Sequence, residues 1–236
     1  MHLHKHLSAA STIHKETPEA KKRRAAIILH KLKELYPKAK TALNYSNTWE
    51  LLVAVILSAQ CTDKKVNEVT ARLFKKYHTL ADYLKASASR RTISEFEQDI
   101  KQCGFYRNKA KNILAAGKVI KEKYKGKVPK TMEEIDALPG VARKTANVVL
   151  GNAYGIVEGI AVDTHVMRLS QKLGLTTHKD PVKIEQDLMK LLPKKEWFDF
   201  TYRLIDYGRG VCTARKHKCE EHALTKIYPK AANLWP

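Results

Sequence analysis

A tight turn between two helical segments, with a lysine just after it, is the feature that most limits how this chain can fold. The sequence Leu-Pro-Gly-Val-Ala-Arg-Lys-Thr-Ala occupies 138–146, and its Pro-Gly pair separates one helical run from the next. Lys144 stands in the first turn of the second helix, and Asp163 follows in Val-Asp-Thr-His at 162–165. The positive end of a helix dipole disfavours a charged amine, so this pair is typical of an amine nucleophile with a carboxylate partner.

Each of these residues also has an ordinary explanation. The turn is compatible with a plain helical hairpin, and a lone helix lysine is usually solvated. Asp-Thr at the start of a helix is a common N-cap, worth about 1 kcal/mol. Capping and catalysis are compatible for Asp163, because a cap fixes the position of the carboxylate.

Apolar residues recur at intervals of three and four along the chain, and strand-like alternation is nowhere sustained. We therefore predict an all-α fold. In the first helix we expect the basic residues 21–24 to face solvent. The expected helices cover 18–35, 49–58, 63–76 with Asp63 as its cap, 80–86, 93–103, 108–124, 131–138, 143–153, 164–173, 182–192 and 197–208.

The charge balance favours a polyanionic partner. The 44 Lys and Arg residues outnumber the 24 Asp and Glu residues, giving a formal charge of +20 and an isoelectric point near 9.8. Nucleic acid is the partner this excess favours, and a merely soluble basic surface is the alternative. A membrane is not expected, because no apolar run approaches the roughly 20 residues that a span requires.

The cysteines and the N-terminus bear on location. Four scattered cysteines are too few for a disulfide scaffold, which fits a reducing cytosol or nucleoid. The N-terminus has no signal-like apolar core, so export is not expected. Its crowded histidines at 2, 4, 6 and 14 are expected to belong to a tail rather than a metal site.

The turn and the helix start after it also predict a phosphate-binding surface. Backbone N–H groups at such a turn and at a helix N-terminus bind phosphate without reading base sequence. The residues expected to form this clamp are Gly140, Val141, Ala142, Arg143 and Thr145.

Three motifs in order resemble those of the endonuclease III family of base-excision DNA glycosylases and AP lyases, in the helix-hairpin-helix superfamily. They are Leu-Ser-Ala-Gln-Cys-Thr-Asp at 57–63, the hairpin with Arg-Lys-Thr-Ala-Asn at 143–147, and Val-Asp-Thr-His at 162–165. The resemblance runs from about Leu43 to Cys219. It implies a two-domain helix-hairpin-helix glycosylase fold with the active-site cleft between the domains.

The domain boundaries that follow from the resemblance are approximate. Residues 1–40 supply a tail and a helix of the second domain, 41–155 form a helical bundle ending in the hairpin, and 156–236 form the C-terminal helical domain. A loop at 212–228 corresponds to the family's metal-cluster loop.

The resemblance implies that Lys144 is the nucleophile and Asp163 the catalytic carboxylate. Such enzymes flip damaged pyrimidines out of double-stranded DNA, remove the base, form a Schiff base, and cleave the strand by β-elimination. Oxidised pyrimidines and abasic sites are the implied substrates. No feature of the sequence demands oligomerisation, so we expect a monomer, and for a prokaryotic source we expect it in the cytoplasm, associated with the nucleoid. A monofunctional glycosylase of the same superfamily and a non-catalytic DNA-binding relic are the alternatives.

Further DNA contacts are implied by position. Gln60 matches the residue that fills the gap left by the flipped nucleotide, and without its flanking motif an ordinary polar residue at a helix end would be the preferred explanation. Phe105 falls where the family often has an aliphatic wedge, and core packing is its alternative. Ala142 stands where the motif often carries a second glycine, and we expect it to be tolerated. His165, Arg215 and Lys216 complete the expected DNA-binding residues.

The C-terminal loop departs from the family. Members usually hold an iron–sulfur cluster with cysteines spaced C-x6-C-x2-C-x5-C. Cys212 and Cys219 keep the first spacing, but His222 and Tyr228 stand at the third and fourth positions. We therefore expect no iron–sulfur cluster and no bound metal. Zinc with His217 as a fourth ligand is the alternative, which the poor chelate spacing disfavours.

Overall fold

The computed structural model describes residues 16–234, and within that range every regular element is a helix. The all-α prediction is confirmed. The α-helices are α1 (Pro18–Leu35), α2 (Thr48–Ser58), α3 (Asp63–Lys76), α4 (Leu80–Ala86), α5 (Arg90–Asp99), α6 (Tyr106–Lys123), α7 (Met132–Asp136), α8 (Arg143–Tyr154), α9 (Thr164–Lys172), α10 (Pro181–Leu191), α11 (Trp197–Gly210) and α12 (Ala223–Ile227). Three short 3-10 helices lie at Lys101–Cys103, Lys194–Glu196 and Pro229–Asn233.

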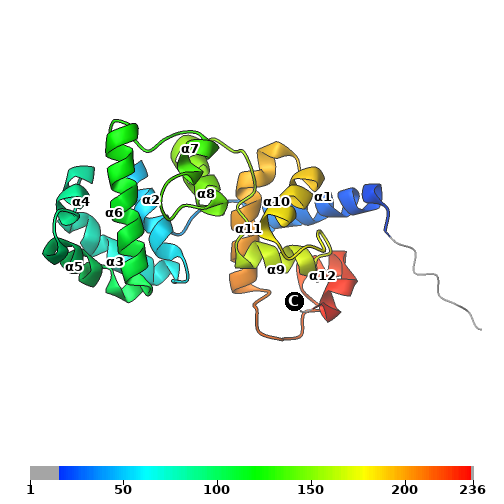
Figure 1. The fold of residues 1–236 in the computed structure, drawn as a ribbon. Helices are drawn as coiled ribbons and strands as arrows, with labels where there is room; N and C mark the ends of the chain where they lie inside the picture. Colours follow the sequence, from blue (N-terminus) through cyan, green and yellow to red (C-terminus); the bar gives the residue numbers. More distant parts are fainter. Residues whose placement is uncertain (1–15, 235–236) are drawn as a thin grey trace, which may run out of the picture.

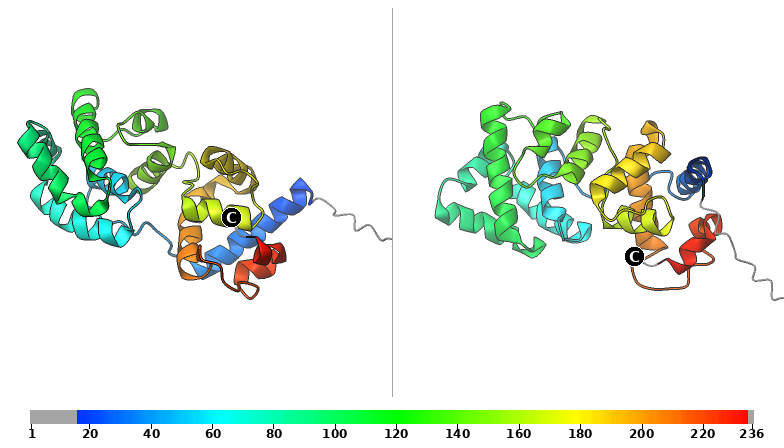
Figure 2. Two further views of the ribbon diagram at one scale, coloured as in Figure 1. Left: turned by 60° about the horizontal axis from the view of Figure 1, so that its bottom comes forward. Right: turned by 45° about the vertical axis from the view of Figure 1, so that its right-hand side comes forward.

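The helices form two groups, each around its own apolar core (Figures 1 and 2). One buried cluster draws on residues 43–161 and gathers α2 to α8. The other joins residues of α1 to residues of α9 to α12. The chain therefore starts in one group, builds the second, and returns to the first. Two separate cores leave a seam between the groups, and clefts at such seams are common binding sites.

Side-chain caps fix where most helices begin. Thr17, Asn47 and Asp180 each accept a hydrogen bond from a backbone N–H in the first turn of the following helix. At α3 the cap is Thr62 and not Asp63 as predicted, because the Thr62 hydroxyl accepts from the Lys65 N–H. Asp63 is the first helical residue, which leaves its carboxylate available to another partner.

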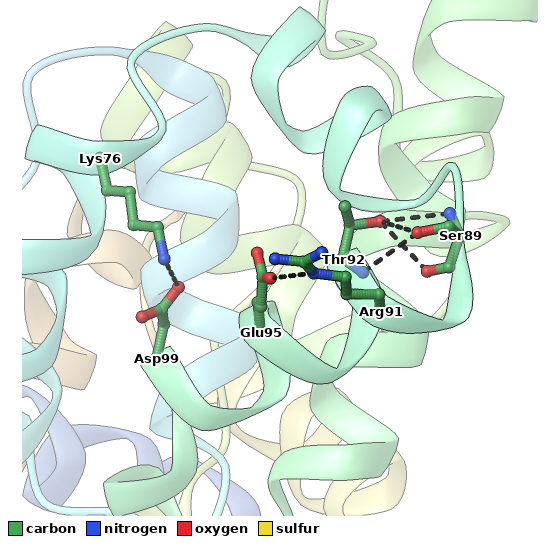
Figure 3. A network of polar contacts seen from close by, with 6 residues as sticks. All are labelled: Lys76, Ser89, Arg91, Thr92, Glu95 and Asp99. Carbon is green, nitrogen blue, oxygen red and sulfur yellow. Dashed lines mark hydrogen bonds and ion pairs between the residues drawn. The ribbon is translucent and has the colours of Figure 1, made fainter.

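The N-terminus and the C-terminus of α5 are both held by polar contacts (Figure 3). Ser89 and Thr92 form a reciprocal capping box at its start. At its end Asp99 pairs with Lys76 of α3, with an N–O distance of 2.6 Å. These surface contacts therefore hold α5 in place, away from the hairpin between α7 and α8 (Figure 1).

The expected solvent-facing run in α1 is wrong at Arg24. Its side chain is 10% exposed, and the guanidinium pairs with Glu16 at 2.6 Å. It also donates to the carbonyl oxygens of Leu173 and Gly174, at 2.5 and 3.2 Å. The side chain therefore ties α1 to the end of α9, a tertiary role that the helical pattern does not reveal.

Polar contacts bridge the two helical groups, among them one of 2.6 Å from the Asn152 amide of α8 to the Tyr202 hydroxyl of α11. The buried carboxylate of Glu185 in α10 accepts from Arg143 at 2.6 and 3.2 Å, and from Asn147 at 3.0 Å. Arg209 of α11 pairs with Asp63 of α3 at 2.6 Å. These contacts connect α8 and α3 of one group with α10 and α11 of the other, across the seam.

None of the helices in residues 16–234 is both long enough and apolar enough to cross a membrane.

Candidate active site

The hairpin between α7 and α8 depends on a left-handed glycine. Gly140 has a φ of +76°, and a Cβ there would lie 2.5 Å from Cβ of Asn112 in α6. The turn closes with a hydrogen bond of 3.1 Å from the Val141 N–H to the Leu138 carbonyl. Only glycine meets both the backbone and the space requirement, so the turn is seated directly on α6.

The residue after this turn leaves the start of α8 open. Ala142 is the N-cap, with φ −126° and ψ 167°, and it provides no side-chain cap. That extended conformation suits any L-residue, so the alanine found at the motif's second glycine position is accommodated without strain. The first N–H groups of α8 are therefore not satisfied by a capping side chain, as expected for an anion-binding helix terminus.

Lys144 lies in the first turn of α8 and is exposed. Within residues 16–234 its amine makes no hydrogen bond and no ion pair. Its neighbour Arg143 differs, because its guanidinium is held by Glu185. Arg143 therefore offers the phosphate clamp its backbone N–H, whereas its side chain joins the two helical groups. Thr145 is half-buried beside them.

Asp163 is the N-cap of α9, and its Oδ1 accepts from the Val166 N–H at 2.8 Å. The carboxylate is half-buried and held in place by this bond. The capping explanation for Asp163 is thus correct. Because capping uses one oxygen and fixes the orientation of the group, the other oxygen stays available to a substrate.

Lys144 and Asp163 line the same cleft, although they come from helices in different groups. The cleft has a volume of about 1360 Å³ and also includes Gln60 and His165. A narrower recess of about 70 Å³ is lined by Lys144, Asp163 and Tyr202 as well. The tertiary structure thus brings together residues that are far apart in the chain.

Four charged residues of this cleft were not anticipated as site residues. They are Lys64, Glu68, Asp63 and Arg209, and the last two form the ion pair that bridges the groups. Arg209 lies in α11, which carries none of the recognised motifs, and no spacing signal connects it to α3. Only the fold places it near Lys144.

His165 is half-buried at the edge of the cleft. Burial lowers its pKa, the nearby Asp163 carboxylate opposes that effect, and Arg209 adds to it. Its Nδ1 is buried and has no hydrogen-bond partner within the described chain. A neutral imidazole is therefore favoured at this position.

Gln60 and Phe105 both project from left-handed backbone. Their φ values are +53° and +47°, which is uncommon for residues other than glycine. The Phe105 side chain is 70% exposed, so core packing does not explain it. Strained, exposed residues of this kind often mark functional positions.

A buried lysine connects the turns that carry Gln60 and Phe105. Lys109 of α6 donates to the carbonyl oxygens of Leu57 and Cys103, both at 2.8 Å. Burial lowers the pKa of its amine. The helical pattern gives no sign of this bond, which fixes the two turns relative to each other.

The C-terminal loop lies outside the cleft. Arg215 and Lys216 are exposed on it and are not among the cleft-lining residues. Tyr228, at the family's fourth cysteine position, packs under the Arg24 guanidinium, 4.1 Å from its ring centroid. A Cβ on Gly174 would lie 2.8 Å from the Tyr228 hydroxyl. Tyr228 therefore serves as a packing residue, and the loop does not supply four thiolates.

The fold and the cleft define a helix-hairpin-helix DNA repair protein, and comparison with known proteins gives the same class. Residues 53–194 match the family described as HhH-GPD superfamily base excision DNA repair protein. Endonuclease III of Synechocystis sp. is 53% identical over 212 residues, covering 90% of this chain and 94% of that protein.

Solved structures agree with this result. A non-covalent endonuclease III–DNA complex and a trapped covalent endonuclease III–DNA intermediate each match with a TM-score of 0.83 and 42% identity. Each match covers 90% of this chain and 97% of the other. The chain belongs to the endonuclease III family.

Proposed function

We propose that this protein is a base-excision DNA glycosylase and AP lyase that removes oxidised pyrimidines from double-stranded DNA and cleaves abasic sites. The observation that carries the proposal is a Lys144 amine that makes no hydrogen bond or ion pair within residues 16–234 and lines the same cleft as the fixed carboxylate of Asp163. The family membership and the +20 charge support a DNA substrate.

The damaged nucleotide is flipped into the cleft, which costs a few kcal/mol and is easiest for a base that stacks poorly. Gln60 and Phe105 lie on turns with left-handed backbone. In this proposal their side chains fill the space left in the duplex. The hairpin and the open N-terminus of α8 hold the backbone phosphates. Binding of this kind positions the sugar next to the amine.

The neutral amine of Lys144 attacks C1′ of the sugar while the bond to the base breaks, and the base leaves with the bonding electron pair. Asp163 stabilises the positive charge that develops on the sugar. Opening of the sugar ring gives a Schiff base between Lys144 and C1′. Loss of a C2′ proton then expels the 3′ phosphate by β-elimination, and water releases the lysine.

Borohydride trapping on duplexes carrying thymine glycol or an abasic site tests the role of the lysine. The unsubstituted chain should form a covalent adduct, and Lys144→Gln should form none while still binding the duplex. Lys64→Gln is the matched control, because Lys64 lines the same cleft from the first turn of α3. An adduct that persists in Lys144→Gln and disappears in Lys64→Gln would assign the chemistry to the other lysine.

Asp163→Asn separates catalysis from capping. Asparagine caps a helix about as well as aspartate, so stability should change by less than about 0.5 kcal/mol. Base release should fall by at least about 100-fold, because the variant lacks the negative charge next to the sugar. Unchanged base release would limit Asp163 to its capping role.

The same trapping assay addresses the alternatives. A monofunctional glycosylase would release the base without an adduct, and a DNA-binding relic would bind without releasing the base. The Lys144 amine lines the cleft and has no partner in the described part of the chain, which favours the bifunctional reaction over both.

We also propose that the enzyme acts in the cytoplasm on the chromosome, as a monomer and without an iron–sulfur cluster. Only two of the four positions in the family's ligand pattern are cysteine, and Tyr228 at the fourth packs against Arg24. Iron and sulfide analysis of the purified protein tests the cluster, and stoichiometric iron would contradict the proposal.

A further inference from the structure

The loop after α11 gathers three metal-binding side chains from separate positions. The Cys212 sulfur, one ring nitrogen of His217 and one of His222 all lie within 4.8 Å of one another. Cys212 follows the end of α11, His217 lies in the middle of the loop, and His222 is the N-cap of α12. Of these, His217 has no counterpart in the family's cysteine pattern.

The His222 ring packs against the His217 ring, with centroids 5.1 Å apart. Its Nδ1 is buried and has no hydrogen-bond partner within residues 16–234. A buried polar atom without a partner costs about 1–3 kcal/mol, so such atoms usually have an ion or a water as partner.

The other two groups are also oriented as ligands. The carbonyl oxygen of Arg215 lies 2.6 Å from His217 Nδ1. When Nδ1 donates to it, the lone pair is on Nε2, which is the usual arrangement of a metal-bound histidine. The buried Cys212 is fixed by Arg168, whose guanidinium donates to the Cys212 and Thr213 carbonyl oxygens at 2.7 and 3.2 Å.

Metal binding at Cys212 requires the thiolate, and a bound metal ion takes the place of the thiol proton. Cys219 is buried in the same loop and supplies a second thiol, with its sulfur 3.8 Å from the Ala232 carbonyl.

We infer that this loop holds one zinc ion through Cys212, His217 and His222, with the remaining tetrahedral position open to Cys219. A mixed thiolate and imidazole set suits zinc better than magnesium or calcium. Ligand atoms on a tetrahedral zinc lie about 3.3–3.8 Å apart. The observed spacing therefore requires an inward movement of about 1 Å, which is small for side chains on an irregular loop.

The site would order a DNA-binding surface. His217 lies between Lys216 and Lys218, so its coordination would fix both lysines relative to α11 and α12. This inference departs from the expectation of no metal, which rested on chelate spacing along the chain. The folded loop brings the three ligand atoms together despite that spacing.

Metal analysis of the full chain, purified without an affinity tag, tests the site. His2, His4 and His6 are replaced by alanine in every protein compared, because a histidine-rich N-terminus binds metal by itself. About one zinc per chain is expected after dialysis. His222→Ala should lose it, and Cys103→Ser, which removes a buried thiol of the other helical group, should keep it.

Cobalt substitution gives a readout that does not depend on a destabilising variant. Co²⁺ bound by Cys212 should show a thiolate-to-cobalt charge-transfer band and intense tetrahedral d–d bands. His217→Gln, on the more exposed part of the loop, should weaken Co²⁺ binding at least tenfold with an unchanged helical circular dichroism spectrum.

Three results would overturn the inference. They are a chain without stoichiometric metal, a chain carrying iron with sulfide, and zinc retained by both His222→Ala and His217→Gln. Metal content is measured without DNA, so its outcome is independent of the trapping assay on Lys144.

Discussion

Replacing Gly140 by alanine should destabilise the protein more than the same change at Gly155. Both glycines flank α8 and have left-handed backbone, with φ of +76° and +65°. At Gly155 a Cβ would meet nothing within 4 Å, whereas at Gly140 it would lie 2.5 Å from Asn112 Cβ. Gly155→Ala therefore measures backbone strain alone, and Gly140→Ala adds the steric conflict with α6.

The magnitudes follow from these two effects. A left-handed alanine costs about 1–2 kcal/mol. Forcing a methyl group into a packed contact adds about 1–3 kcal/mol, because Asn112 or the turn must move by about 1 Å. We expect about 1–2 kcal/mol for Gly155→Ala and about 2–5 kcal/mol for Gly140→Ala.

Thermal unfolding measures the difference directly. In a chain of this size 1 kcal/mol shifts the midpoint by about 2–4 °C, so Gly140→Ala should melt at least about 2 °C below Gly155→Ala. Its binding to an undamaged duplex should weaken as well, because the displaced turn carries the N-terminus of α8. Equal midpoints for the two variants would refute the claim that the hairpin is seated directly on α6.

Three further predictions concern the seam, the exposed Phe105 side chain and the cleft. Glu185→Gln should lower the free energy of unfolding, measured with denaturant, by about 2 kcal/mol; the 40% exposure of its partner Arg143 limits this value. No loss would mean that the Glu185–Arg143 contact between the groups does not stabilise the fold. Phe105→Ala should leave stability within about 0.5 kcal/mol but weaken binding to an abasic duplex about tenfold in a titration, since stacking is worth about 1–3 kcal/mol; unchanged affinity would exclude insertion. Because the folded pKa of His165 is lowered below its unfolded value of about 6.5, the unfolded chain binds more protons there and stability falls as pH drops below about 6.5. Between about pH 7 and pH 5 the melting temperature of His165→Gln should therefore fall by less than that of the unsubstituted protein. An identical fall in both would exclude His165 as the cause.

Local features of the sequence were sufficient for the helices and the hairpin. The three- and four-residue apolar spacing defined most helices, because a helix must bury one face to be stable. The Pro-Gly turn defined the hairpin, because few residues other than glycine adopt the left-handed backbone required at Gly140. Errors occurred where a tertiary partner decided the outcome, as for Arg24, which is buried against the end of α9.

The sequence predicted only part of the candidate site. Motifs with fixed spacing identified Lys144 and Asp163, but nothing in the order of residues indicated that Arg209 and Asp63 pair across the cleft. Nor did chain spacing indicate that His217 approaches Cys212 and His222. Local propensity acts over a few residues, so the sequence by itself determined the secondary structure and the motifs. The cleft and the C-terminal ligand group depend on contacts between segments far apart in the chain. Only the packing of the helices creates those contacts.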